Sequence, residues 1–123
     1  MPTVVEPARP RAMTLAPAEV VRTLTAVLGS KVVAIIGGVK DTRSVRAWQR
    51  EESPPTRIDA LRLALRVADI IKTRDRDDVV RAWFGGTNQF LGGENPALFV
   101  ANRYQYHTDQ MKILDAARAF ISE

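Results

Sequence analysis

The sequence contains no cysteine and only one histidine, and these scarcities exclude several kinds of chemistry. A chain without cysteine forms no disulfide and has no reactive thiolate, which fits a reducing cytoplasm. One histidine is too few for the usual protein metal cage, so we expect no metal site. The best candidate for a long apolar run, residues 26–39, is interrupted by Ser30 and Lys31 and falls short of the roughly 18 residues of a membrane span. We therefore predict a cytoplasmic protein that does not enter the membrane.

Residue patterns that indicate catalysis are equally sparse. Glu51 and Glu52 are adjacent, so on a helix they would point in different directions and would not form an acid–base pair. The glycine-rich residues 86–93 lack the Lys-Ser/Thr ending and the preceding strand of a phosphate-binding loop. His107 alone is more typical of a surface or packing residue than of a catalyst. We expect a protein that is not an enzyme and that uses no cofactor.

What the chain does have is enough apolar material, 46% of its 123 residues, for one domain with a substantial core. Apolar residues recur with helical spacing, and no segment shows the sustained alternation of a strand. We predict an all-α helical bundle with a disordered tail at 1–14, a front region at 15–55 and a back region at 56–123. The predicted helices are Pro17–Leu28, Lys31–Ile36 (capped by Ser30 and buried), Asp41 or Thr42 to Arg50, Arg57 to about Lys72, Asp77–Phe84, a short helix entered at Pro96, and Tyr104–Ile121.

The helix predicted at 57–72 is apolar over most of its circumference, which is typical of a helix at the centre of a bundle. Its narrow polar stripe would allow Asp59 to pair with Arg62, and Arg66 with Asp69. In the last helix we expect the inner side to carry Met111, Ile113, Leu114, Ala117, Phe120 and Ile121.

Positive charge is concentrated in the first part of the chain. Residues 1–76 carry 14 Lys and Arg against 8 Asp and Glu, a balance of +6, while residues 77–123 carry 4 against 6, a balance of −2. The first part could therefore face a polyanion, and a solvated basic surface is the alternative explanation of the same charge.

The helix predicted at 41–50 combines two apolar anchors, Val45 and Trp48, with an otherwise polar and basic surface. Such anchors fix the angle of a DNA-reading helix, whose other side chains reach bases and phosphates. Ala34 and Gly38 supply the small residue and the turn glycine of a helix-turn-helix, with a turn one residue longer than the commonest pattern. The candidate DNA-binding residues are Lys40, Thr42, Arg43, Ser44, Arg46, Gln49 and Arg50. A helical hairpin that binds nothing is the alternative.

The stretch from Ala82 to Val100 contains two glycine pairs, each followed two residues later by an asparagine, and is too apolar for a simple connection. Such a segment either packs on its own domain or contacts another molecule. We expect Trp83 and Leu91 to pack inside, and Phe84, Phe90 and the tyrosines to be available to a partner.

In this order, the motifs resemble the Xre/MbcA/ParS toxin-binding-domain family of antitoxins, which partner RES-domain toxins. The resemblance covers about residues 27–120. In the back half it lies in Trp83, Asn88, Phe90-Leu91-Gly92-Gly93, Asn95-Pro96, Leu98 and a terminal helix with Met111, Ile113 and Leu114. In the front half it lies in Leu28-Gly29, Ser44-Val45, Trp48 and the Pro54-Pro55 breaker.

The resemblance implies an N-terminal Xre-like helix-turn-helix followed by a C-terminal helix–loop–helix toxin-binding unit. It further implies a type II antitoxin that forms a homodimer, neutralises an NAD-consuming RES-domain toxin by covering its active site, and binds its own operator DNA. The implied toxin-binding residues are Trp83, Phe84, Asn88, Gln89, Phe90, Leu91, Asn95, Pro96, Arg103, Tyr104 and Tyr106. A stand-alone helix-turn-helix transcriptional regulator and an adaptor protein are the alternatives.

Overall fold

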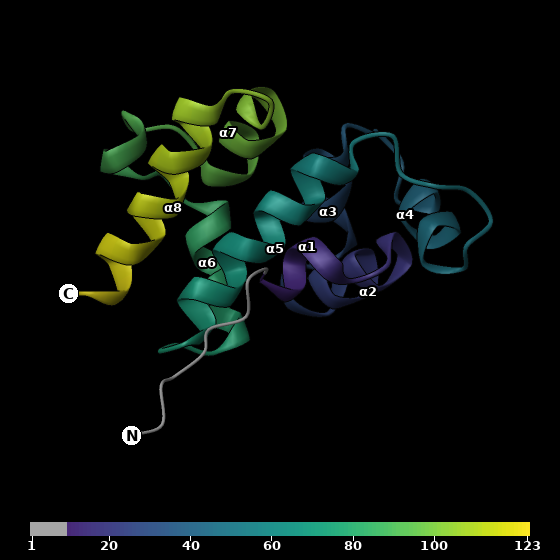
Figure 1. The fold of residues 1–123 in the computed structure, drawn as a ribbon, viewed down its shortest axis with the longest axis horizontal. Coiled ribbons are helices and arrows are strands. Elements are labelled where there is room, and N and C mark those ends of the chain that lie inside the picture. The colour runs from purple at the N-terminus through teal and green to yellow at the C-terminus, as the bar shows by residue number, and fades with distance from the viewer. Residues whose placement is uncertain (1–9) are drawn as a thin grey trace, which may run out of the picture.

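The computed structural model describes residues 10–123, and every regular element in that range is helical (Figure 1). The predicted all-α fold is confirmed. None of the described helices is both long and apolar enough to cross a membrane. The elements are α1 (Arg11–Thr14), α2 (Pro17–Leu28), α3 (Ser30–Gly37), α4 (Thr42–Gln49), α5 (Ile58–Lys72), α6 (Asp77–Gly85), the 3₁₀ turn η1 (Gln89–Leu91), α7 (Pro96–Arg103) and α8 (His107–Ile121).

Helix α5 is the centre of the bundle, as its apolar circumference predicts. In Figure 1 it runs between α1–α4 on one side and α6–α8 on the other, and it contacts α1, α2, α3, α6, α7 and α8. Leu61, Leu65 and Ile71 of this helix are among the largest fully buried side chains in the described chain. Each contributes about 2 kcal/mol through burial, so α5 joins the front and back regions into one core.

Most helix boundaries follow the proline and glycine signals of the sequence. Helix α2 has the predicted bounds with Pro17 in its first turn, and α7 begins at Pro96. The last helix starts later than predicted, at His107 instead of Tyr104. The Gln110 side chain donates a hydrogen bond of 2.6 Å to the carbonyl of Tyr104, the residue that ends α7. This bond gives a partner to a carbonyl that has none within the helix, so the chain turns after Tyr104 before α8 begins.

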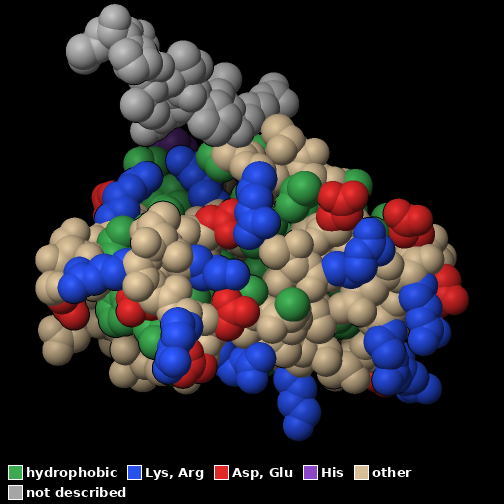
Figure 2. Space-filling model, turned by 90° about the horizontal axis from the view of Figure 1, so that it is seen from below, with side chains coloured by type: hydrophobic (Ala, Val, Ile, Leu, Met, Phe, Trp, Pro, Cys, Tyr) green, Lys and Arg blue, Asp and Glu red, His purple; other side chains and the backbone are tan. Residues whose placement is uncertain are grey.

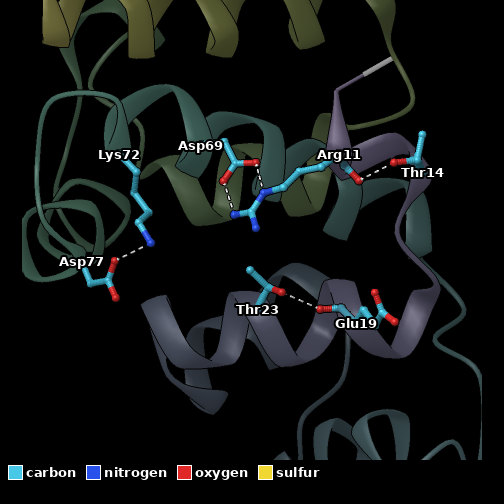
Figure 3. Close-up of polar contacts among 7 residues, drawn as sticks. All are labelled: Arg11, Thr14, Glu19, Thr23, Asp69, Lys72 and Asp77. Atoms are coloured by element: carbon cyan, nitrogen blue, oxygen red, sulfur yellow. Dashed lines mark hydrogen bonds and ion pairs between the residues drawn. The ribbon is translucent and has the colours of Figure 1, made fainter. Parts of the chain in front are cut away.

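The prediction of a structureless tail through residue 14 is wrong at its end, because residues 11–14 form α1. Ala12 is fully buried there, and Arg11 forms two hydrogen bonds with Asp69 of α5, from Nε (2.8 Å) and Nη2 (2.6 Å) (Figure 3). Arg62 of α5 donates to the carbonyls of Ala12 and Leu15. The other part of that prediction, residues 1–9, lies outside the described residues.

These contacts with α1 also replace both ion pairs predicted within α5. Asp69 binds Arg11 instead of Arg66, and the guanidinium of Arg62 turns to α1 instead of Asp59. Asp69 accepts two hydrogen bonds in a fork from Arg11, and Arg62 donates instead to two backbone carbonyls of the α1 segment.

Helix α3 begins and packs differently from the prediction. Ser30 is its first residue, the N-cap is Gly29 with φ +85°, and no side chain caps the helix. Ile35 is 43% exposed, so the prediction of a fully buried helix is wrong on one face.

Gly37, at the end of α3, is the small residue on which α4 packs. A β-carbon at position 37 would lie 2.6 Å from Cη2 of Trp48, a distance that two carbons do not tolerate. The sequence pointed to Ala34 for this close approach; Ala34 is buried, but the Trp48 ring lies on Gly37. The next residue, Gly38, has φ +76° and ends the helix in the left-handed region that favours glycine.

Candidate functional site

The loop between α6 and α7 is closed by its own backbone. The amide of Asn88 donates to the Glu94 carbonyl (3.1 Å), and the amide of Gly93 donates to the Asn88 carbonyl (2.9 Å). Gly92 and Gly93 have φ of +67° and +83°, where a β-carbon would be strained. The Asn88 side chain caps η1 by accepting from the Phe90 amide (2.9 Å). These bonds hold the segment in one conformation, with Phe90 on η1.

Asn95 fastens this loop to the helices on both sides. Its Oδ1 accepts from the amide of Leu98 (3.0 Å), which caps α7. Its Nδ2 donates to the carbonyls of Phe84 (2.9 Å) and Gly86 (2.8 Å), which are left over at the end of α6. One amide side chain thus links the end of one helix to the start of the next.

Several residues that the sequence proposed for partner binding belong to the core. Phe84 is fully buried and packs edge-to-face on Trp83 with ring centroids 5.3 Å apart, so its assignment to the interface is wrong. Trp83 (8% exposed) and Leu91 (1% exposed) are inside, which confirms their predicted packing. Pro96 is buried as well. These four shape the unit, and their side chains are not available to a partner in this conformation.

Other predicted residues do face solvent. Phe90 is 59% and Tyr106 57% exposed, and Gln89 is exposed beside them in sequence. The remaining predicted residues, Asn88, Asn95, Arg103 and Tyr104, are half-buried. Arg103 forms an ion pair of 3.1 Å with Glu94 and lies 5.2 Å from the ring centroid of Phe99.

Two further apolar residues of the back half, which were not among the predicted binding residues, are also exposed. Leu98 is 50% exposed because its neighbours Phe99 and Val100 take the inner face of α7. Met111 was predicted inside but is 40% exposed, because the inner stripe of α8 is formed by Gln110, Ile113, Leu114 and Ala117. We call Phe90, Leu98, Tyr106 and Met111 the apolar set.

Helix α4 presents the second candidate surface. Its predicted anchors are confirmed: Val45 is fully buried and Trp48 is 5% exposed. Asp41 caps the helix by accepting from the Arg43 amide (2.8 Å). Lys40, Arg43, Arg46 and Arg50 are exposed, whereas Thr42, Ser44 and Gln49 are half-buried. The predicted DNA-binding residues thus lie away from the anchors, on or beside one short helix.

The cations of this surface differ in their partners. Arg43 donates to the Asp41 carboxylate (2.8 Å), which lowers the pKa of Asp41 and raises the pKa of Arg43. Lys40, Arg46 and Arg50 form no ion pair with described residues. These three side chains therefore offer unpaired positive charge to a polyanion, whereas Arg43 is paired with Asp41.

Positive charge is not gathered in one patch on the face that Figure 2 shows, where basic side chains are spread across the molecule with acidic ones between them. Part of the basic excess binds backbone carbonyls: Arg22 donates to Gln49 (2.6 Å), Arg57 to Ala101 (3.3 Å), Arg81 to Val27 (3.1 Å) and Arg74 to Ile121. These four arginines use donors on the protein's own backbone, so fewer basic side chains are free to contact nucleic acid than the net charge suggests.

The described residues contain no group of three or more His, Asp or Glu side chains placed to hold a metal ion. Comparisons with protein-family models, with curated proteins and with solved structures found no match to this chain. The family resemblance stays a prediction from motifs, and function has to be proposed from the two surfaces described above.

Proposed function

We propose that this protein is an antitoxin that neutralises an NAD-consuming RES-domain toxin through the surface of its back half. The observation that carries the proposal is the distribution of exposed large apolar side chains. Of the six in the described chain, four form the apolar set between residues 90 and 111, and the other two are Met13 and Ile35. Exposed aromatic and apolar side chains concentrated in this way are typical of protein interfaces.

The rigidity of the loop supports the same proposal. A loop whose backbone is fixed before binding loses less conformational entropy when the complex forms. The Asn88 cap and the backbone bonds of the loop fix the main chain at Phe90, and α8 contacts both α7 and η1, the turn that carries Phe90. An aromatic side chain presented in this way suits insertion into a concave surface, such as the active-site cleft that the resemblance implies.

Co-expression with the toxin encoded beside this protein tests the proposal. We expect the wild type to abolish growth arrest, and Phe90→Ser with Leu98→Ser to lose at least about 30-fold in affinity, because central aromatic anchors contribute about 2 kcal/mol or more. Ile35→Ser, which alters an exposed apolar side chain of the front region, should protect as well as the wild type. Arrest that persists with soluble wild type, or full protection by the double variant, would refute the proposal.

A second function, binding of operator DNA as a homodimer, is favoured by the outward face of α4. The helix is anchored by Val45 and Trp48 and carries three exposed cations without ion pairs in or beside its eight residues. A short anchored helix with solvent-facing cations is suited to the DNA groove and its phosphates. If no toxin partner exists, the same surface supports a stand-alone transcriptional regulator.

Salt-dependent binding to the DNA upstream of its own gene tests this second function. Arg46→Ala with Arg50→Ala should weaken binding and reduce the slope of log affinity against log salt by about 3.6, since the two protomers of a homodimer together lose four phosphate contacts and each removes about 0.9. Lys112→Ala with Arg118→Ala removes two exposed cations from α8 and should leave that slope unchanged. Equal slopes for wild type and the α4 variant would exclude DNA binding through α4.

A further inference from the structure

A pocket of about 330 Å³ lies where α1, α5 and the α7–α8 connection meet, and none of the four side chains of the apolar set lines it. Its volume is at the lower end of the range for small-molecule sites. Two arginines one helical turn apart and one aspartate give its lining a net positive charge. The lining includes Arg62, Arg66, Asp59, Met13, Leu63 and Tyr104. We propose that this pocket binds a small organic anion, in which a carboxylate or phosphate monoester is attached to an apolar body.

The guanidinium of Arg66 has no partner among the described residues. Asp69, the carboxylate three residues after it, is occupied by both hydrogen bonds from Arg11 (Figure 3). Arg66 is half-buried and forms no ion pair or hydrogen bond with the described residues. A partly buried guanidinium with five unmatched donors favours an anion that can accept two of them in parallel.

Arg62 supplies the second cation. Its Nη1 is engaged by the carbonyls of Ala12 (3.1 Å) and Leu15 (2.8 Å), which fixes the guanidinium at the pocket and leaves its other donors for a ligand. Asp59, which could have neutralised it, forms no ion pair with described residues. Both arginines, and Asp59 with them, therefore line the pocket without an ion pair to a described residue.

The remaining lining determines the other half of the ligand. Leu63 and Tyr104 are half-buried and pack against the core, and Met13 is 47% exposed on α1. These side chains offer apolar and aromatic surface next to the guanidinia, so an inorganic ion would leave that surface hydrated while an organic anion would cover it. The pocket should therefore bind an anion with an apolar body more tightly than an inorganic anion of the same charge.

Calorimetric titration with phenyl phosphate, benzoate and inorganic phosphate tests the inference on the full chain. We expect saturable binding of phenyl phosphate or benzoate, and which of the two binds tighter identifies the anionic group. Arg66→Gln should weaken that binding about tenfold or more, the usual value of a charged hydrogen bond. Arg66→Lys keeps the charge but loses the planar fork, so its affinity for the organic anion should lie between those of the wild type and Arg66→Gln. Arg46→Gln, an exposed cation of α4, should leave the affinity unchanged.

The outcomes separate cleanly. A melting temperature of Arg66→Gln equal to that of the wild type, together with weakened binding, supports the pocket. Absence of saturable binding of both organic anions at millimolar concentration overturns it. Inorganic phosphate that binds as tightly as phenyl phosphate, or an equal loss in Arg46→Gln, also overturns it, because either would show attraction by net charge alone.

Discussion

Phe84→Ala should lower the free energy of unfolding by about 3–5 kcal/mol, the usual cost of removing a buried phenyl ring. Phe90→Ala, six residues later, should change it by no more than about 0.5 kcal/mol, as expected for a surface substitution. The contrast follows from burial, since Phe84 is fully buried against Trp83 and Phe90 is 59% exposed. Urea unfolding of the two variants, followed by far-UV circular dichroism, measures both values.

The same two variants separate stability from partner binding. If the apolar set is the toxin interface, Phe90→Ala weakens the complex while the protein stays folded, and Phe84→Ala affects the complex only through the loss of folded protein. Similar unfolding midpoints for the two variants would contradict the burial of Phe84. A Phe84→Ala variant that is as stable as the wild type but binds the partner more weakly would indicate that Phe84 contacts the partner directly.

The burial of Phe84 is one feature that the sequence does encode. Val80, Trp83 and Phe84 stand at i, i+3 and i+4, the spacing of a single helical face, and all three are buried. The sequence predicts this helix over Asp77–Phe84, but Phe84 stands directly before the glycine pair at the helix end, and it was assigned to a partner surface. Most of the other helices and their ends were predictable for the related reason that proline, glycine and apolar spacing act locally.

Contacts between residues distant in sequence explain what could not be predicted. Helix α1 is four residues long, and an isolated helix of that length is unstable in water. It exists because Arg11 reaches Asp69, 58 residues away, and because Ala12 is buried on the bundle. No local pattern signals such a partner. The pocket beside α1 depends on the same contacts, so it could not be inferred from the sequence either.

The loop that carries Phe90 was predictable in part: its turns are encoded locally, but its contacts with the neighbouring helices are not. The glycine pairs and the asparagines predict turns, and the structure has left-handed glycines at 92 and 93 and asparagine caps at 88 and 95. The sequence does not show how many hydrogen bonds each asparagine side chain forms. Asn88 uses only its oxygen, whereas Asn95 uses its oxygen and both donors of its amide nitrogen.

Substituting each asparagine by aspartate should expose this difference. Asn88→Asp keeps the capping oxygen and should change the free energy of unfolding by about 0.5 kcal/mol or less. Asn95→Asp also keeps a cap, but it loses two donors and directs a carboxylate at the carbonyls of Phe84 and Gly86. We expect a loss of about 2–3 kcal/mol, since each hydrogen bond is worth about 1 kcal/mol and the carbonyls lose their partner. Thermal and urea unfolding of the two variants measure the difference.

Asn95→Ala provides a further comparison, because it removes the cap as well and should cost about 3 kcal/mol in total. If Asn95→Asp were as stable as Asn88→Asp, the amide nitrogen would contribute nothing and α6 and α7 would be linked by packing alone. If it is destabilised as expected, partner binding by folded Asn95→Asp should also weaken, because the loop that presents Phe90 is tied to α6 through that nitrogen. Loss of the tie would restore the conformational freedom that the closed loop otherwise removes before binding.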